Sequence, residues 1–112
     1  MNNLYQRQQV ALSSLRARVR QSLEVDSWRF GHETVRIADN KCFLEVLLLD
    51  TNSGGGVIIS AEIPEDTAEF PSLTPLVPAA HWAERAIGDF FGLRAVGHPR
   101  WKSLILHEAW PL

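Results

Sequence analysis

The fold is decided by the stretch Phe70–Leu106, FPSLTPLVPAAHWAERAIGDFFGLRAVGHPRWKSLIL. Three prolines make residues 70–78 a stiff, extended segment, because each proline fixes φ and lacks a backbone N–H. Pro78 suits the first position of a helix, where the missing N–H leaves no hydrogen bond unmade. Gly92 suits the position just past a helix end. The stretch therefore predicts a helix over about residues 78–92.

The two sides of this helix differ in chemistry. Its apolar positions recur with helical period and predict a face that packs on a core. They are Ala80, Ala83, Ile87, Phe90 and Phe91. At about 100° per residue, Trp82, Arg85 and Asp89 gather on the other side, and Glu84 lies at the edge of the apolar stripe. Protein interfaces favour Trp and Arg, so we expect another protein to cover this side. Alternatively, Trp82 folds back onto its own loops, and Arg85 and Asp89 form an exposed i,i+4 pair.

Residues 3–23 predict a second, amphipathic helix. Its apolar residues lie near one helical face, and arginines occupy the remaining surface. They are Leu4, Leu12, Leu15, Val19 and Leu23. The arginine cluster is a solvated face, or it meets a phosphate backbone or an acidic subunit. Four arginines without an acidic residue are also typical of a transit peptide, but the continuous apolar stripe favours a structural helix.

After residue 24 the period changes and predicts a sheet. Cys42–Leu49 (CFLEVLLL) is nearly apolar throughout, so we expect a central strand that is covered on both faces. Val57–Ile63 is its natural antiparallel neighbour, because the glycine-rich segment Thr51–Gly56 supplies the positive φ angles that a hairpin connection needs. Shorter strands are predicted at Ser27–Phe30, at Glu33–Ile37 before a turn at Ala38–Asn40, and at Ser103–His107. The sequence thus predicts an α+β fold with an N-terminal helix within residues 1–24 and an α+β core over residues 25–112.

Composition limits the class of protein. The chain has 112 residues, of which 46% are hydrophobic and 21% are charged, which fits a single globular domain over residues 1–112. The net charge of −2 and the pI near 6.0 provide no overall field that attracts nucleic acid or anionic membranes. The lone Cys42 cannot form an internal disulfide, which favours a reducing compartment such as the cytosol. No apolar run approaches the roughly 20 residues of a spanning helix, so we expect membrane association only through partners.

No residue pattern predicts chemistry within this chain. The histidines and Cys42 are scattered one to an element, without the paired spacing of zinc sites. Glu84 and Asp89 point in different directions on their helix, which argues against an acid–base dyad. The glycines Gly54–Gly56 lack the Lys-Ser/Thr of a phosphate-binding loop and join two strands. The four tryptophans are not interleaved with a basic strand surface, as they are in single-strand binders.

Four short motifs carry a resemblance to a known family. They are Ile63–Asp66 (IPED), Pro71–Arg85 (PSLTPLVPAAHWAER), Asp89–Leu93 (DFFGL) and Gly97–Pro99 (GHP). Together they resemble the thirty-kilodalton subunit family of respiratory complex I, over about residues 33–112. That family includes the C subunit of bacterial NADH:quinone oxidoreductase and the related component G, or N-terminal domain, of membrane-bound nickel–iron hydrogenases such as formate hydrogenlyase.

In that family the helix motif reads E-R-E-x-x-D before two apolar residues, with a His or Lys further on and a basic residue before a short apolar strand. The matching residues here are Glu84, Arg85, Asp89, Phe90, Phe91, His98 and Lys102. Ala86 replaces the second glutamate, which weakens the expectation of a polar contact there. The ending Leu104–Pro111 resembles the hydrogenase branch more than the NADH branch. The chain stops before the basic tail that complex I members usually carry, as an isolated domain or a truncated chain would.

The resemblance implies an α+β fold that holds no cofactor, metal or catalytic residue of its own. It implies partners: a large subunit with a quinone site or a nickel–iron site, and a small subunit with iron–sulfur clusters. It implies a place in the cytoplasmic, peripheral arm of a membrane-associated oxidoreductase, without nucleic acid. The expected docking residues are Trp82, Glu84, Arg85, Asp89 and His98. Two alternatives stay open: an enzyme domain in which Glu84 or His98 transfers protons near a partner's cofactor, and a nucleic-acid module that uses the arginine-rich first helix.

Overall fold

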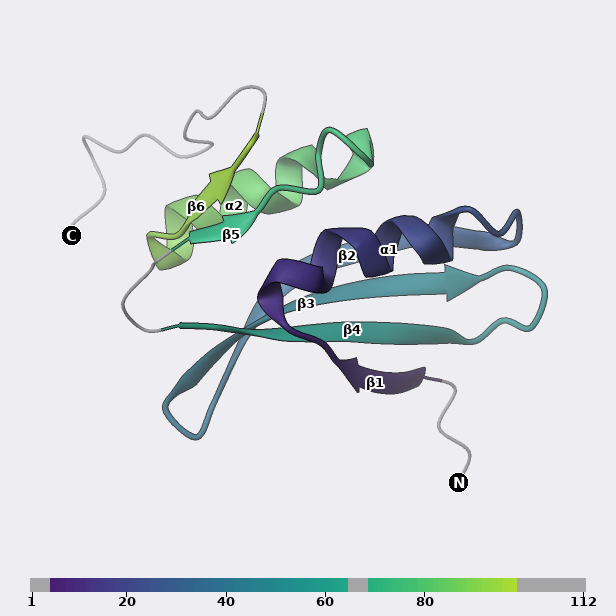
Figure 1. Cartoon of the computed structure of the whole chain (residues 1–112), viewed down its shortest axis with the longest axis horizontal. Helices are drawn as coiled ribbons and strands as arrows, with labels where there is room; N and C mark the ends of the chain where they lie inside the picture. The colour runs from purple at the N-terminus through teal and green to yellow at the C-terminus, as the bar shows by residue number, and fades with distance from the viewer. Residues whose placement is uncertain (1–4, 65–68, 99–112) are drawn as a thin grey trace.

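The computed structural model describes residues 5–64 and 69–98 and has an α+β fold, as predicted. The strands are β1 (Tyr5–Gln9), β2 (Trp28–Ala38), β3 (Lys41–Asp50), β4 (Gly56–Ile63), β5 (Glu69–Pro71) and β6 (Arg94–Val96). The helices are α1 (Leu15–Leu23) and α2 (His81–Phe91), preceded by the short 3₁₀ turns η1 (Leu12–Ser14) and η2 (Pro78–Ala80). Figure 1 shows α1 lying along the main sheet, with β5, β6 and α2 grouped next to it.

The main sheet has the strand order β1-β4-β3-β2, so β3 is central, as predicted. Its neighbours β2 and β4 are antiparallel to it, whereas β1 is parallel to β4. The β2–β3 turn falls at the predicted place. Asp39 and Asn40 have φ angles of 53° and 61°, the left-handed pair that suits the right-handed twist of a two-residue hairpin.

The two strands predicted at Ser27–Phe30 and Glu33–Ile37 are one strand, β2, with a bulge between Phe30 and His32. Gly31 occupies the bulge. A Cβ on Gly31 would lie 3.1 Å from the carbonyl oxygen of Leu47, so the close approach of β3 favours glycine there. The bulge interrupts the alternating pattern, which is why the sequence predicts two short strands.

One core lies between the main sheet and both helices. Leu44, Val46 and Leu48 of β3 are fully buried on the face that receives Leu15 of α1 and Ile87 of α2. The prediction that β3 is covered on both faces is wrong: on the opposite face, its side chains Phe43, Leu47 and Leu49 are only half-buried. The helices pack their buried side chains on the first face, and the second face keeps contact with solvent.

The N-terminal helix is present but starts later than predicted. Residues 5–9 form β1, an edge strand with exposed side chains, and the helix begins at Leu15. The segment YQRQQ has no apolar stripe that would pack a helix on the core. Its backbone hydrogen bonds to β4 therefore outweigh its helix propensity, and it forms a strand. The residues Leu15 and Val19 of the predicted stripe are buried, and Leu4 lies outside the described residues.

The second helix begins and ends as predicted. Pro78 opens η2, which leads directly into α2, and Gly92 follows the last helical residue with a φ of 69°. The Gly92 N–H donates to the carbonyl of Gly88 over 3.0 Å. A short strand, β6, follows the helix and pairs in parallel with β5. The strand predicted at Ser103–His107 lies outside the described residues.

Candidate docking surface

Four side chains meet at α2 and form the surface that we call the α2 face: the exposed Trp82 and the half-buried His81, Arg85 and His98. Trp82 is 62% exposed, and the guanidinium carbon of Arg85 lies 5.1 Å from its ring centroid. The His81 ring meets Trp82 edge-on at 5.1 Å between centroids and lies 4.8 Å from the His98 ring. Arg85 Nη1 lies 3.2 Å from His81 Nε2. A cation–π contact at such an exposed site contributes about 0.5–1 kcal/mol and holds both side chains in one arrangement.

Three of the predicted docking residues therefore come together: Trp82, Arg85 and His98. Sequence reasoning missed His81, which joins them. The signal was available, because His81 precedes Trp82 and lies four positions before Arg85, the spacing at which helical side chains meet.

Glu84 lies at the centre of the buried side of α2, not at its edge as predicted. It is 0% exposed and accepts hydrogen bonds from the Ser72 hydroxyl (2.6 Å), the Leu73 N–H (2.7 Å) and the Thr74 hydroxyl (2.8 Å). These three donors satisfy its carboxylate, which explains how a glutamate is tolerated where an apolar residue is expected. Glu84 fixes α2 to the segment 72–74, so it supports the α2 face from within.

Asp89 is also buried, at 7% exposed, so the prediction that it faces outward with Trp82 is wrong. Conversely, Phe91, which the apolar stripe places in the core, is 42% exposed. The helix contacts both β2 and β6, so its buried face is set by two neighbouring elements and differs from the face that hydrophobicity alone predicts.

Glu33 on β2 is a buried carboxyl group that sequence reasoning did not single out. It is 1% exposed, and neither carboxyl oxygen has a hydrogen-bond partner among the described residues. Burial raises the pKa of Glu33 well above 4.5, and the neighbouring carboxylate of Glu84 adds to the shift. Two buried carboxyl groups lie side by side at low cost only when one carries a proton, so a protonated Glu33 suits this position. Strand alternation puts Glu33 on the same face as the core residue Val35, a signal that could have revealed it.

A second polar cluster lies on the half-exposed face of the main sheet. Glu45 of β3 accepts hydrogen bonds from Arg7 Nε and from Arg36 Nε, each over 2.8 Å. Burial acts to raise the pKa of Glu45, but the hydrogen bonds from the two arginines outweigh it and lower the pKa. The cluster ties β1 and β2 to the central strand.

Chemistry at a metal or a thiol finds little support in the described residues. Within residues 5–64 and 69–98, no three His, Cys, Asp or Glu side chains are placed to hold a metal ion. Burial raises the pKa of the Cys42 thiol, which makes it a poor nucleophile at neutral pH. No helix in that part of the chain is long and apolar enough to cross a membrane.

Comparison with known proteins points to one family. The family described as "Respiratory-chain NADH dehydrogenase, 30 Kd subunit" matches residues 8–112. Hydrogenase-4 component G of Escherichia coli is 47% identical over 89 residues, which are 77% of this chain and 16% of that protein. Formate hydrogenlyase subunit 5 of the same organism is 33% identical over 82 residues, 73% of this chain and 14% of that protein. The C/D subunit of NADH-quinone oxidoreductase from Methylococcus capsulatus is 35% identical over 63 residues, 56% of this chain and 11% of that protein. The chain thus spans about a sixth or less of the length of these relatives.

Solved structures share the fold. A chain of the membrane-bound sulfane sulfur reductase, an archaeal respiratory membrane complex, superposes with a TM-score of 0.83 at 22% identity, covering 97% of this chain and 66% of that one. The trypsin-resistant fragment of Nqo5 superposes with a TM-score of 0.73 at 16% identity, covering 84% of this chain and 80% of the fragment.

Proposed function

Because this chain belongs to the family of the 30 kDa subunit of respiratory-chain NADH dehydrogenase, we propose that it is a non-catalytic docking domain of a membrane-associated oxidoreductase complex. Its partner is the large subunit of that complex, which carries the quinone site or the nickel–iron site. The assembly also includes a small subunit with iron–sulfur clusters, and this chain contributes no cofactor. The domain belongs to the cytoplasmic, peripheral arm. The higher identity to hydrogenase-4 component G than to the C/D subunit of NADH-quinone oxidoreductase supports the hydrogenase branch.

The observation that carries this proposal is the exposed Trp82, stacked by Arg85 on a helix that Glu84 fixes from within. Interface hot spots are enriched in Trp and Arg, since both bury a large area with specific geometry. The stacking also reduces the side-chain entropy that would be lost on binding. Trp82, Arg85 and His98 contact the partner in this proposal, and Glu84 and Asp89 act by holding them in place.

The test is the affinity of the chain for the purified large subunit of the same organism's complex. Trp82→Ala is expected to weaken binding about 30-fold, the equivalent of a hot spot of about 2 kcal/mol. Because Trp82 is largely exposed, its removal should lower the free energy of unfolding by no more than about 1 kcal/mol, the size of its cation–π contact with Arg85. Tyr5→Ala is the matched control, since Tyr5 is an exposed aromatic residue on β1 and its loss should leave the affinity unchanged. A folded Trp82→Ala, Arg85→Ala double variant that binds as tightly as the wild type would refute the proposal.

Proton transfer by Glu84 or His98 is the second candidate, favoured by the buried Glu33 carboxyl group beside Glu84, whose pKa burial raises. Its test is the assembled complex with Glu84→Gln or His98→Ala. Full assembly combined with lost proton-coupled turnover would support proton transfer, whereas full turnover would exclude it.

A further inference from the structure

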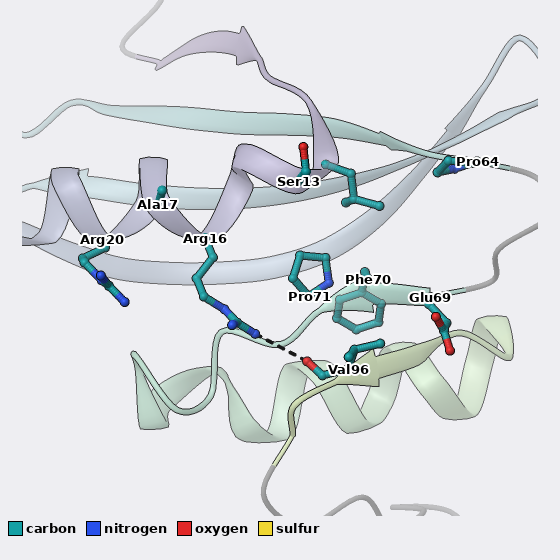
Figure 2. Close-up of a pocket in the computed structure, with 10 residues that line it drawn as sticks. Ser13, Arg16, Ala17, Arg20, Pro64, Glu69, Phe70, Pro71 and Val96 are labelled. Carbon is teal, nitrogen blue, oxygen red and sulfur yellow. Dashed lines mark hydrogen bonds between the residues drawn. The ribbon is translucent and has the colours of Figure 1, made fainter.

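A groove of about 680 Å³ lies between α1 and the β5–β6 pair (Figure 2). Its lining is mainly apolar: Leu12, Ala17, Pro64, Phe70, Pro71 and Val96. Val96 is among the exposed large apolar side chains of the described residues. The groove uses no residue of the α2 face, so it is a separate surface.

The α1 wall of the groove carries positive charge. Arg16 donates to two backbone carbonyls, Ser72 O over 3.0 Å and Val96 O over 3.4 Å, so its contacts leave the cationic charge unneutralised. Arg20, one helical turn further, points from α1 to the same side (Figure 2) and has no hydrogen-bond or ion-pair partner in the part of the chain that the structure describes. Among the described residues that line the groove, the acid is Glu69, which lies at the other end and is 3.9 Å from Arg94 outside the groove.

We propose that this groove binds a segment of a neighbouring protein that carries an acidic side chain next to a large apolar one. The apolar floor would bury the apolar side chain, and Arg20 together with Arg16 would pair with the carboxylate, for which guanidinium geometry is well suited. The volume lies within the range of about 300–1,000 Å³ that is typical of sites for small ligands, so it fits a few side chains. A protein occupant is favoured because the relatives are named as subunits and components of larger assemblies.

The experiment is selection of random octapeptides on the full 112-residue chain by phage display, followed by fluorescence anisotropy with the enriched peptides. We expect enrichment of Asp or Glu within two positions of Leu, Ile, Phe or Trp. Arg20→Gln should weaken binding of the enriched peptide about fivefold, the effect of one partly exposed ion pair. Ala17→Glu, at an exposed position of α1, should weaken it at least about tenfold by adding bulk and negative charge.

Two variants serve as controls. Arg18→Gln removes an arginine from the same helix, but Arg18 bonds to Gln8 (2.7 Å) and lies outside the groove, so the affinity should be unchanged. Trp82→Ala should also leave it unchanged, which separates this site from the α2 face.

Three results would overturn the proposal. The first is enrichment of neutral or basic peptides only, and the second is equal binding of the enriched peptides to wild type and Ala17→Glu. The third is failure to enrich any peptide while the chain binds phosphatidylglycerol vesicles in an Arg20-dependent way, since the occupant would then be a lipid headgroup. Folding of each variant is checked by circular dichroism, and Arg20→Gln alone keeps the test valid if Ala17→Glu misfolds.

Discussion

Replacing Glu33 by glutamine is expected to remove a pH dependence of folding stability. In the unfolded chain, the Glu33 carboxyl is exposed and titrates near its ordinary pKa of 4.5. In the folded chain, burial and the charge of Glu84 raise that pKa, so between the two values the folded state binds one proton more. The contribution of Glu33 is therefore fully present below pH 4.5 and is lost as the pH rises toward the raised pKa. The free energy of unfolding falls in this window by about 1.4 kcal/mol per pH unit.

Glutamine has the same shape as Glu33 but carries no titrating proton, and its amide can donate a hydrogen bond to Glu84. The stability of Glu33→Gln relative to wild type should thus increase with pH by about 1.4 kcal/mol per unit, from about pH 5 until the raised pKa is passed. The assay is urea denaturation followed by tryptophan fluorescence at half-unit steps from pH 5 to 8, at constant ionic strength. Because groups away from this pair titrate alike in both proteins, the difference reports the titration of Glu33 together with its coupled neighbour Glu84. A difference that stays constant over this range would refute the assignment of a buried, protonated carboxyl at this position.

Three further substitutions test the packing. Glu45→Gln should reduce the free energy of unfolding by about 1 kcal/mol above pH 5, because the half-exposed arginines Arg7 and Arg36 lose a charged acceptor. This loss of stability should shrink as the pH falls below 4.5, because the pKa of Glu45 is lowered in the folded chain. A loss of stability that acid does not change would contradict the ion pairs. Gly92→Ala should destabilise the chain by about 1 kcal/mol in thermal unfolding, since φ at this position is 69°; an unchanged melting temperature would mean that the helix end is not left-handed. Ile87→Ala should reduce stability by about 2–4 kcal/mol in urea, and a loss below about 1 kcal/mol would show that this side of α2 does not pack on the core.

Local determinants made much of the fold predictable. Pro78 and Gly92 mark the limits of the second helical segment through their own backbone preferences, and Asp39 and Asn40 favour the β2–β3 turn for the same reason. Such signals act within a few residues, so they do not depend on the rest of the structure. The edge strand β1 gives no such signal. Its conformation depends on pairing with β4, a strand far along the chain, while its own polar sequence is compatible with several conformations.

The candidate site was predictable in part for a related reason. The helical positions of Trp82 and Arg85 predict that these two side chains lie together on the outer side of the helix. The burial of Glu84 is not predicted in this way, because the apolar stripe places this glutamate at its edge unless the donors that satisfy the carboxylate are known. Those donors come from Ser72, Leu73 and Thr74, which only the folded chain brings to the helix.

Ser72 joins the two surfaces for which binding is proposed. Its hydroxyl donates to Glu84 on α2, and its carbonyl accepts from Arg16 on α1. Ser72 therefore connects α1 to α2 by hydrogen bonds, in addition to the core that the two helices share. Because energetic coupling between two sites is reciprocal, any effect of a groove ligand on the affinity at the α2 face would be matched by an equal effect in the reverse direction.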